Sequence, residues 1–307
     1  MHKYLVIGAG TIGTLVARNL AGKGYQVGIV SRHGSDPKLE NVKAVALDAG
    51  NAQLVSDLAV GAHAIFNCAN PLYHRWMTDW PPIADALLHA ARSSGAVLVT
   101  LGNLYAYGKV DGPMTAAHPL DATYAKAQVR AKMWNDALYA HQQGQVRATE
   151  VRASDFIGPG AKSFVGTDMI QRILRGKKCW TVGALDLPHS WTYVADVAVA
   201  LVAAAQSEHA LGHAWHVPTN PPRSQRQVLC DLAERAGVPR PNVSSLPTPV
   251  LRAAGVFHPI LRELPKTLYQ FTNPFIMDDS ATRKTFGLEP TPWSTVLDTT
   301  IDACRSA

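Results

Sequence analysis

The sequence predicts an α/β protein with a doubly wound parallel sheet, followed by a smaller lobe in the C-terminal half. Three observations support this prediction. Short runs rich in Val, Ile and Leu alternate with longer Ala-rich helical segments, a glycine-rich turn joins the first strand to the first helix, and prolines become frequent past Arg152. A sheet of this kind has helices on both faces and binds its ligands at the carboxyl ends of its strands.

Six strands and four helices are expected in the first half of the chain, because β-branched runs alternate there with helical periodicity. The expected strands are Lys3 to Gly8, Gln26 to Ser31, Lys43 to Leu47, Ala64 to Asn67, Ala96 to Leu101 and Arg147 to Arg152. The expected helices are Thr11 to Gly22, Ala52 to Ala59, Thr78 to Ser93 and Thr123 to Gln142, and a proline-initiated surface helix is expected over Pro290 to Ile301.

The composition excludes several classes of protein. The chain has 307 residues, 47% of them hydrophobic and 17% charged, as in an ordinary globular protein. The net charge is +6, but the basic residues are scattered, so we expect no nucleic-acid partner. No apolar stretch is long enough to span a membrane and the N-terminus lacks the features of a signal peptide. The four cysteines form no CxxC pair, which favours reduced thiols in the cytoplasm and no metal site.

The glycine-rich turn predicts a dinucleotide site. Gly8, Gly10 and Gly13 form G-x-G-x-x-G directly after a strand and before a helix. The first glycine permits the tight turn, the second lets the backbone approach a pyrophosphate, and the third allows close helix packing. Free amides at the helix start, at Thr11 and Ile12, would face the anion.

The end of the second strand favours NADP(H) over NAD(H). A carboxylate at this point would bind the adenosine ribose of NAD, but here the sequence reads Val30-Ser31-Arg32-His33. Ser31 and Arg32 could instead hold a 2′-phosphate through charge-assisted hydrogen bonds.

Five short motifs, in their order and spacing, carry a family resemblance over nearly the whole chain. They are residues 8–13, Leu47-Asp48, Asn103 to Gly108 (NLYAYG), Val151 to Gly160 (VRASDFIGPG) and Trp191 to Ala198 (WTYVADVA). Together they resemble the short-chain dehydrogenase/reductase superfamily, and in particular its extended or atypical NAD-dependent epimerase/dehydratase members. The resemblance implies a Rossmann-type NADP-binding domain over residues 1–155. It also implies that residues 156–307 form mainly a substrate-binding lobe, from which the last sheet strand and the helix near 194–206 return to the first domain.

The resemblance also implies roles for individual residues. Asp48 would contact the adenine, and Ala69 and Asn70 would border the cofactor after the fourth strand. Asp155 and Trp191 would line the substrate pocket. Extended members often form homodimers through two helices, which correspond here to the third and fourth expected helices.

The catalytic pair of the family is altered in this chain. The family places a Tyr-x-x-x-Lys pair on a helix, where the lysine lowers the pKa of the phenol and holds the nicotinamide ribose. Tyr124 stands at the tyrosine position, but Gln128 replaces the lysine beside the cofactor. Lys126 is two residues from Tyr124, and we expect it on a different helical face. Tyr124 should therefore remain a neutral phenol that can donate a proton.

Four other residues are candidates for the site. Asn103 occupies the Ser/Thr position of the family and can donate a hydrogen bond to a carbonyl, while Tyr105 is an alternative proton donor. Tyr107 is expected to wall the pocket, and His74 lies on the loop after the fourth strand, which faces the ligand crevice. The apolar and aromatic stretch from Leu251 to Met277 hints at an apolar ligand.

These observations predict an NADP(H)-dependent oxidoreductase that reduces a small, relatively apolar carbonyl or enone, with Tyr124 as proton donor. Two alternatives stay open. One is a redox-neutral epimerase or dehydratase that uses the cofactor transiently. The other is a sensor without catalytic activity that resembles the NmrA-type regulators, which keep the dinucleotide turn and lose the catalytic pair.

Overall fold

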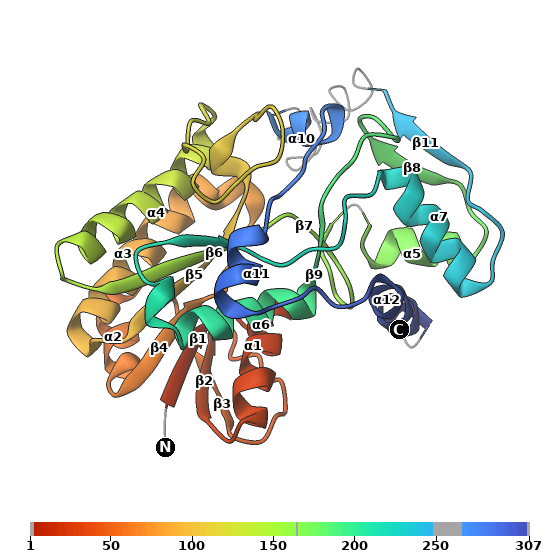
Figure 1. The fold of residues 1–307 in the computed structure, drawn as a ribbon. Helices are drawn as coiled ribbons and strands as arrows, with labels where there is room; N and C mark the ends of the chain where they lie inside the picture. The colour runs from red at the N-terminus through yellow and green to blue at the C-terminus, as the bar shows by residue number, and fades with distance from the viewer. Residues whose placement is uncertain (1–2, 164, 248–265, 306–307) are drawn as a thin grey trace.

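The computed structural model describes residues 3–163, 165–247 and 266–305 (Figure 1). Most of the first half of the chain alternates strands with helices. Its elements are β1 (Lys3–Ile7), α1 (Thr11–Gly22), β2 (Gln26–Ser31), β3 (Val42–Ala46), α2 (Ala52–Ala59), β4 (Ala62–Asn67), α3 (Trp76–Ser94), β5 (Val97–Asn103), α4 (Ala125–Gln142) and β6 (Arg147–Ala153).

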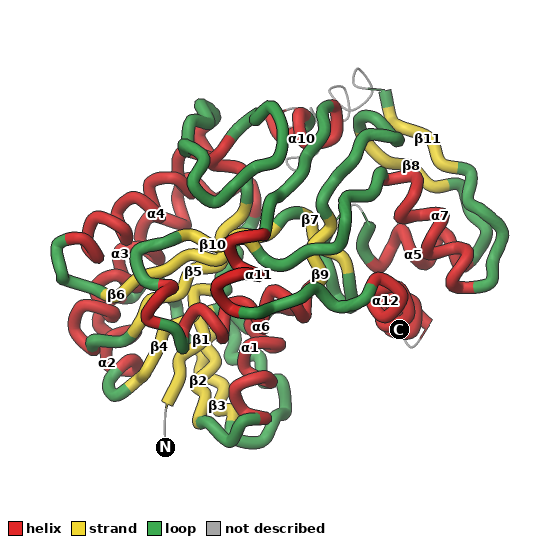
Figure 2. The backbone as a smooth tube through the Cα atoms, viewed as in Figure 1, coloured by secondary structure: helices red, strands yellow, loops and turns green. Residues whose placement is uncertain are grey.

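These strands form a seven-stranded sheet together with β10 (Ala214–His216) (Figure 2). The strand order is β10-β6-β5-β4-β1-β2-β3, and every neighbouring pair is parallel. The chain therefore changes direction across the sheet between β1 and β4, as in a Rossmann fold. This result confirms the predicted fold class.

Alternate residues of the central strands enter two separate cores. On β1, Tyr4 and Val6 pack with α1 and α6 (Val194–Ala205), whereas Leu5 and Ile7 pack with α2, α3 and α4. The period of two along a strand explains this division, because successive side chains point to opposite faces. The apolar runs of the sequence therefore reflect strands that are covered on both sides.

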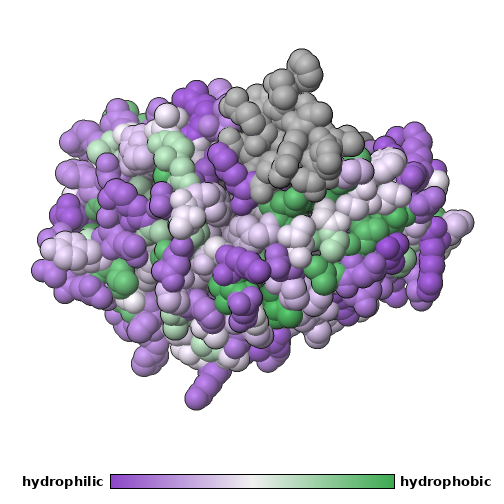
Figure 3. Space-filling view, turned by 90° about the horizontal axis from the view of Figure 1, so that it is seen from above, coloured by the Kyte–Doolittle hydropathy of each residue, from purple (hydrophilic) through white to green (hydrophobic). Residues whose placement is uncertain are grey.

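The remaining elements form the second lobe, shown on the right in Figure 1. Two short parallel pairs organise it, β7 with β9 and β8 with β11. Its elements are β7 (Asp155–Ile157), α5 (Thr167–Leu174), β8 (Cys179–Val182), β9 (Trp191–Tyr193), α7 (Gln225–Ala236), β11 (Val243–Leu246), α10 (Tyr269–Thr272), α11 (Ser280–Phe286) and α12 (Trp293–Arg305). Seen from above, the larger hydrophobic areas of the surface lie over this lobe, partly beside residues outside the described ranges (Figure 3).

The expected elements are observed with small shifts at their ends. The third helix begins at Trp76, two residues earlier than expected, and it includes Pro81 and Pro82 in its second turn, where each lacks the N–H of a helical hydrogen bond. The fourth helix begins at Ala125 and not at Thr123, which leaves Tyr124 as its extended N-cap residue. The C-terminal helix runs from Trp293 to Arg305. Of the apolar stretch from Leu251 to Met277, residues 251–265 lie outside the described residues.

Within the described part of the chain, no helix is both long and apolar enough to cross a membrane.

Candidate functional site

The glycine turn after β1 leaves room for a ligand at one position only. A Cβ atom at Gly8, where φ is +106°, would lie 2.5 Å from the carbonyl oxygen of Cys68, and one at Gly13 would lie 1.8 Å from the carbonyl oxygen of Gly8. Both glycines are therefore required by the protein itself. A Cβ atom at Gly10 would meet no protein atom within 4 Å. The space above Gly10 is thus open to an approaching phosphate group.

The start of α1 can bind that anion. Gly10 is the N-cap residue and supplies no side chain, so the first amides of the helix lack a side-chain acceptor. The Thr11 hydroxyl does not fill this role, because it donates a hydrogen bond to the carbonyl oxygen of Gly160 at 2.9 Å. Thr11 therefore offers its backbone to a ligand, while its side chain ties the turn to the loop after β7.

Residues predicted to bind the adenosine part follow β2 and β3 at the same edge of the sheet. The Ser31 hydroxyl accepts a hydrogen bond from the Ser35 amide at 2.9 Å and keeps its own proton to donate. Arg32 is exposed. Asp48 Oδ1 accepts a hydrogen bond from the Gly50 amide at 2.9 Å, which orients the carboxylate and leaves its second oxygen for an adenine amine.

The crossing point of the sheet lies between β1 and β4, and the chain after β4 borders it. Asn67 Oδ1 accepts a hydrogen bond from the Ala69 amide at 3.3 Å, which shapes this loop. Asn70 is exposed just beyond it. Because ligands of doubly wound sheets bind where the strand order reverses, Ala69 and Asn70 lie where a dinucleotide would pass. Together with the open space at Gly10, this arrangement fits the dinucleotide that the sequence predicts.

Four tyrosines from separate segments form a ring-to-ring chain, which we call the tyrosine cluster: Tyr73, Tyr105, Tyr124 and Tyr269. Each neighbouring pair of ring centroids is 6.4 Å apart, in the order 73, 105, 124, 269. The hydroxyls of Tyr124 and Tyr269 are buried and face each other, but neither has a partner within ordinary hydrogen-bond distance among the described residues. Buried hydroxyls are nearly always paired, so this pair of orphaned groups indicates a binding site for a polar ligand.

The phenols of the cluster are held in their neutral form. Burial raises the pKa of Tyr124 far above its usual range, and the neighbouring Tyr269 and Tyr105 add to the increase. Burial, followed by the nearby carboxylate of Asp155, likewise raises the pKa of Tyr105 well above its usual value. Both side chains are thus hydrogen-bond donors at neutral pH and not bases.

Asp155 reaches this cluster from β7 and is held by a buried histidine. Asp155 Oδ2 lies 2.8 Å from His189 Nε2, and the side chains are 21% and 3% exposed, respectively. The other ring nitrogen of His189, Nδ1, lies 3.2 Å from the carbonyl oxygen of Gln270. The pair connects to the cluster through Phe275, whose ring lies 5.1 Å from that of His189 and 6.2 Å from that of Tyr269, and the negative charge of Asp155 contributes to the raised pKa of Tyr105 and Tyr269.

Asn103 ends β5 next to the same cluster. Its Oδ1 accepts a hydrogen bond from the Tyr105 amide at 3.2 Å and so caps the short 3₁₀ turn that carries Tyr105. The side-chain NH2 has no partner among the residues that the structure describes, so it can donate to a ligand oxygen. Asn103 therefore combines a turn-forming role with a free donor.

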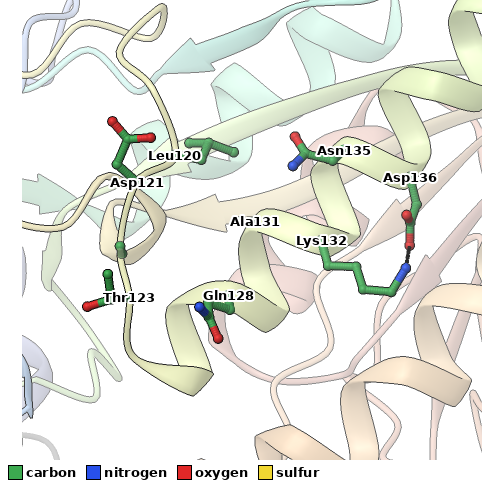
Figure 4. Close-up of a pocket in the computed structure, with 9 residues that line it drawn as sticks. Leu120, Asp121, Thr123, Gln128, Ala131, Lys132, Asn135 and Asp136 are labelled. Carbon is green, nitrogen blue, oxygen red and sulfur yellow. Dashed lines mark hydrogen bonds and ion pairs between the residues drawn. The ribbon is translucent and has the colours of Figure 1, made fainter.

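The structure separates Gln128 from Tyr124 and brings Lys126 towards the cluster. Gln128 is exposed in a shallow hollow on the outer side of α4, with Leu120, Asp121 and Thr123 (Figure 4). It does not join the tyrosines, and its predicted contact with the cofactor stays a prediction. Lys126 is only 5% exposed, and its Nζ lies 3.7 Å from the centroid of the Tyr73 ring. The two residues lie on opposite sides of α4 because they are two positions apart in the helix.

Three further residues predicted to contact the substrate are not members of the tyrosine cluster. Tyr107 is 3% exposed, and its hydroxyl is hydrogen-bonded to buried Arg152 and to His216 Nε2, which gives it a structural position in place of the predicted pocket contact. Trp191 is also buried, and its indole N–H donates to the carbonyl oxygen of Arg223 at 2.8 Å. It packs behind His189 at a ring distance of 4.7 Å and does not reach the cluster directly. His74 is exposed on the turn after β4.

Sequence reasoning missed two residues that the fold brings to the site. Tyr269 was expected only as one of several aromatic residues in the apolar stretch from Leu251 to Met277. Nothing in the sequence pointed to His189. A single histidine in a proline-rich segment gives no spacing to interpret, and its partner Asp155 is 34 residues away. Only the pairing of β7 with β9 brings the two segments together.

Comparison with known proteins assigns this Rossmann-type α/β protein to a family. The sequence profile of the NAD dependent epimerase/dehydratase family matches residues 4–217, well over half of the chain. The chain belongs to that family, as its motifs predicted. Among curated proteins, no sequence matches the chain.

Several solved structures share the fold at low sequence identity. They include the enzyme WbmH of Bordetella bronchiseptica in complex with NAD+, with 20% identity, 99% of this chain and 98% of that chain covered, and a TM-score of 0.77. UDP-glucose 4-epimerase of Thermotoga maritima with UDP-glucose has 17% identity, 99% of both chains covered and a TM-score of 0.80. dTDP-glucose 4,6-dehydratase of Bacillus anthracis with NAD has 16% identity, 100% and 97% covered and a TM-score of 0.79. The described part of the chain thus shares its fold with these proteins.

Proposed function

We propose that the chain is a nicotinamide dinucleotide-dependent enzyme that catalyses a redox-neutral epimerisation or dehydration. The family match and the epimerases and dehydratases among its structural neighbours favour this alternative over the net reduction of a carbonyl. When bound, the cofactor would take a hydride from the substrate and return it later. The residues that would hold it are Gly10, the first amides of α1, Asp48 and the loop at Ala69 and Asn70.

The observation that supports catalysis most strongly is the pair of buried, unpartnered hydroxyls at Tyr124 and Tyr269. Both lie at the carboxyl edge of the sheet, where Asn103 adds a free amide donor. Donors of this kind stabilise negative charge that develops on a substrate oxygen. A purely regulatory binding protein would have no need to bury two phenol groups without partners.

For the cofactor, we infer a preference for NADP(H) from Arg32. Its exposed guanidinium at the end of β2 can form a bidentate contact with a 2′-phosphate, and Ser31 keeps a proton to donate. Calorimetry with the four cofactor forms tests this preference. Arg32→Asp should weaken NADPH binding far more than NADH binding, and an unchanged ratio of the two dissociation constants would exclude Arg32 from the site.

The function itself is tested by the fate of the cofactor. The purified protein is loaded with NAD+ or NADP+, freed of excess, and incubated in deuterium oxide with sugars, nucleotide sugars, secondary alcohols and ketones. A redox-neutral enzyme should convert a substrate while absorbance at 340 nm returns to its starting value. In a parallel assay with added NADPH, steady consumption of NADPH would show the reductase. Tight binding of one oxidation state without turnover would indicate the sensor.

A further inference from the structure

A redox-neutral reaction that begins with an alcohol needs a group to accept the hydroxyl proton. In this chain Tyr124 is poorly suited to that task, because burial raises the pKa of its phenol and Gln128 brings no positive charge to it. The titratable groups that face the cluster are Lys126 beside Tyr73, the phenols of Tyr105 and Tyr269, Asp155 and, behind Asp155, His189. A proton acceptor needs a lone pair that is not already protonated, and among these side chains the carboxylate of Asp155 offers one.

The partners of His189 determine where its protons can be. Nδ1 faces the carbonyl oxygen of Gln270 at 3.2 Å, and a carbonyl can only accept, so Nδ1 carries a proton. Nε2 faces Asp155 Oδ2 at 2.8 Å. A second proton must lie between these two atoms, either on the ring, which gives an imidazolium and a carboxylate, or on Asp155, which gives two neutral groups.

The surroundings favour the charged arrangement. The imidazole ring is stacked on Phe271 with centroids 5.0 Å apart, on Phe275 at 5.1 Å, and against Trp191 at 4.7 Å. Aromatic faces also attract a cation that lies over them, so these rings can offset part of the cost of burying an imidazolium. Asp155 is partly exposed, so its charge is less costly, and a carboxyl group gives up its proton before an imidazolium does.

We propose that Asp155, held in its ionised form by the His189 imidazolium, is the group that exchanges a proton with the substrate hydroxyl. This inference rests on the proposed function and assigns a proton acceptor within the same site. The hydroxyl proton passes to Asp155; an oxidised nicotinamide dinucleotide, when bound, would supply the acceptor for the hydride of the carbon that bears this hydroxyl, so that a C=O bond can form there. Tyr124 donates a hydrogen bond to the same oxygen, and His189 acts as a positioning residue.

Nitrogen NMR of the histidine side chains tests the charge of the pair without any substrate. The full chain, labelled with ¹⁵N-histidine and loaded with cofactor, is measured at pH 7, and His189→Gln assigns the His189 signals. His216 is the matched control, because it is equally buried and burial lowers its pKa to about 4, so it stays neutral. We expect both nitrogens of His189 to be protonated, and only one in Asp155→Asn. A neutral His189 in the unaltered chain would place the proton on Asp155 and overturn the inference.

Turnover then separates the inference from the proposed function. With any alcohol found active in the screen, Asp155→Asn should lower kcat by about 10²-fold or more while leaving the cofactor dissociation constant unchanged. His189→Gln should shift the acidic limb of the pH profile of kcat, a change that a merely structural role would not produce. Wild-type turnover in Asp155→Asn would refute the inference and leave the proposed function standing. If the unaltered chain turns over no probe, the proposed function fails, while the NMR result still decides whether Asp155 is ionised.

Discussion

The glycine turn after β1 and the tyrosine cluster lie at the same edge of the sheet, but they are built in opposite ways. The turn consists of backbone from six consecutive residues, and its geometry depends on glycines at fixed spacing. The cluster consists of side chains from separate segments, the turn after β4, the turn after β5, the start of α4, and α10. Asp155 and His189 add two further segments of the chain.

This difference shows which part of an active site evolves without a change of fold. The turn binds parts of a cofactor that many enzymes share, and its contacts come mostly from backbone amides. The cluster must fit one substrate, and any of its segments can change a side chain without disturbing the sheet. Replacement of the family lysine by Gln128, and the inward position of Lys126, are examples of such change.

The largest effect is expected from a methyl group inside the turn. In Gly13→Ala the new Cβ would lie 1.8 Å from the carbonyl oxygen of Gly8, which is backbone and cannot move aside. We expect a loss of stability of more than about 4 kcal/mol, measured by urea denaturation, or failure to fold. Gly22→Ala, in the same helix and with no atom within 4 Å of its Cβ, is the control and should be as stable as the parent. Equal stability of the two variants would contradict the close contact that defines the turn.

Tyr124→Phe should have the opposite signature, a loss of activity without a loss of stability. The hydroxyl faces that of Tyr269 and has no partner at ordinary hydrogen-bond distance among the described residues, so its removal relieves a buried polar group and should leave the melting temperature unchanged or higher. Loss of a donor to the reacting oxygen should lower kcat by about 10²-fold. A clear drop in melting temperature would show that the hydroxyl has a structural partner, and the cluster would then be part of the core.

The sequence predicted the sheet and the turn well because both depend on local information. Strand runs, helix periodicity and the spacing of Gly8, Gly10 and Gly13 are readable within short windows. The ends of helices and strands were misplaced by a few residues, and that shift matters at Tyr124, because an N-cap residue does not follow the helical wheel. The argument that placed Gln128 beside Tyr124 on one helix face therefore did not apply.

The rest of the site could not be predicted because it depends on contacts between distant segments. Tyr107 was placed in the pocket from its position after β5, but its hydroxyl is bound by Arg152 and His216, which lie on β6 and β10. Tyr269 and His189 enter the site only through the packing of the second lobe. No periodicity or motif in the sequence connects these residues.

The buried hydrogen bonds that join Tyr107 to Arg152 and His216 should make stability depend on pH. Burial lowers the pKa of His216 to about 4, whereas an unfolded chain would hold it near 6.5. As the pH falls, the unfolded state therefore binds this proton first. The stability that depends on neutral His216 is fully present above pH 6.5 and is lost as the pH falls towards 4. The expected loss is about 3 kcal/mol in the free energy of unfolding. His216→Gln should flatten this dependence. His213→Gln should not, because His213 is exposed just before β10. Parallel curves for both variants would show that His216 is charged in the folded chain.

The smallest expected effect is also the one that compares the two regions most directly. A Cβ at Gly10 meets no protein atom, so Gly10→Ala should fold and should change the free energy of unfolding by no more than about 1 kcal/mol, as for an altered N-cap. The added methyl group would instead occupy the space through which a phosphate reaches the start of α1. The dissociation constant of the cofactor, measured by calorimetry, should rise by about 10-fold or more, which corresponds to about 1.4 kcal/mol. Gly22→Ala again serves as the control, since its methyl group is equally unobstructed but lies at the far end of the helix. If Gly10→Ala binds the cofactor as tightly as Gly22→Ala does, the pyrophosphate does not cross the turn at Gly10. The glycines of the turn would then serve only the protein's own packing, through Gly8 and Gly13.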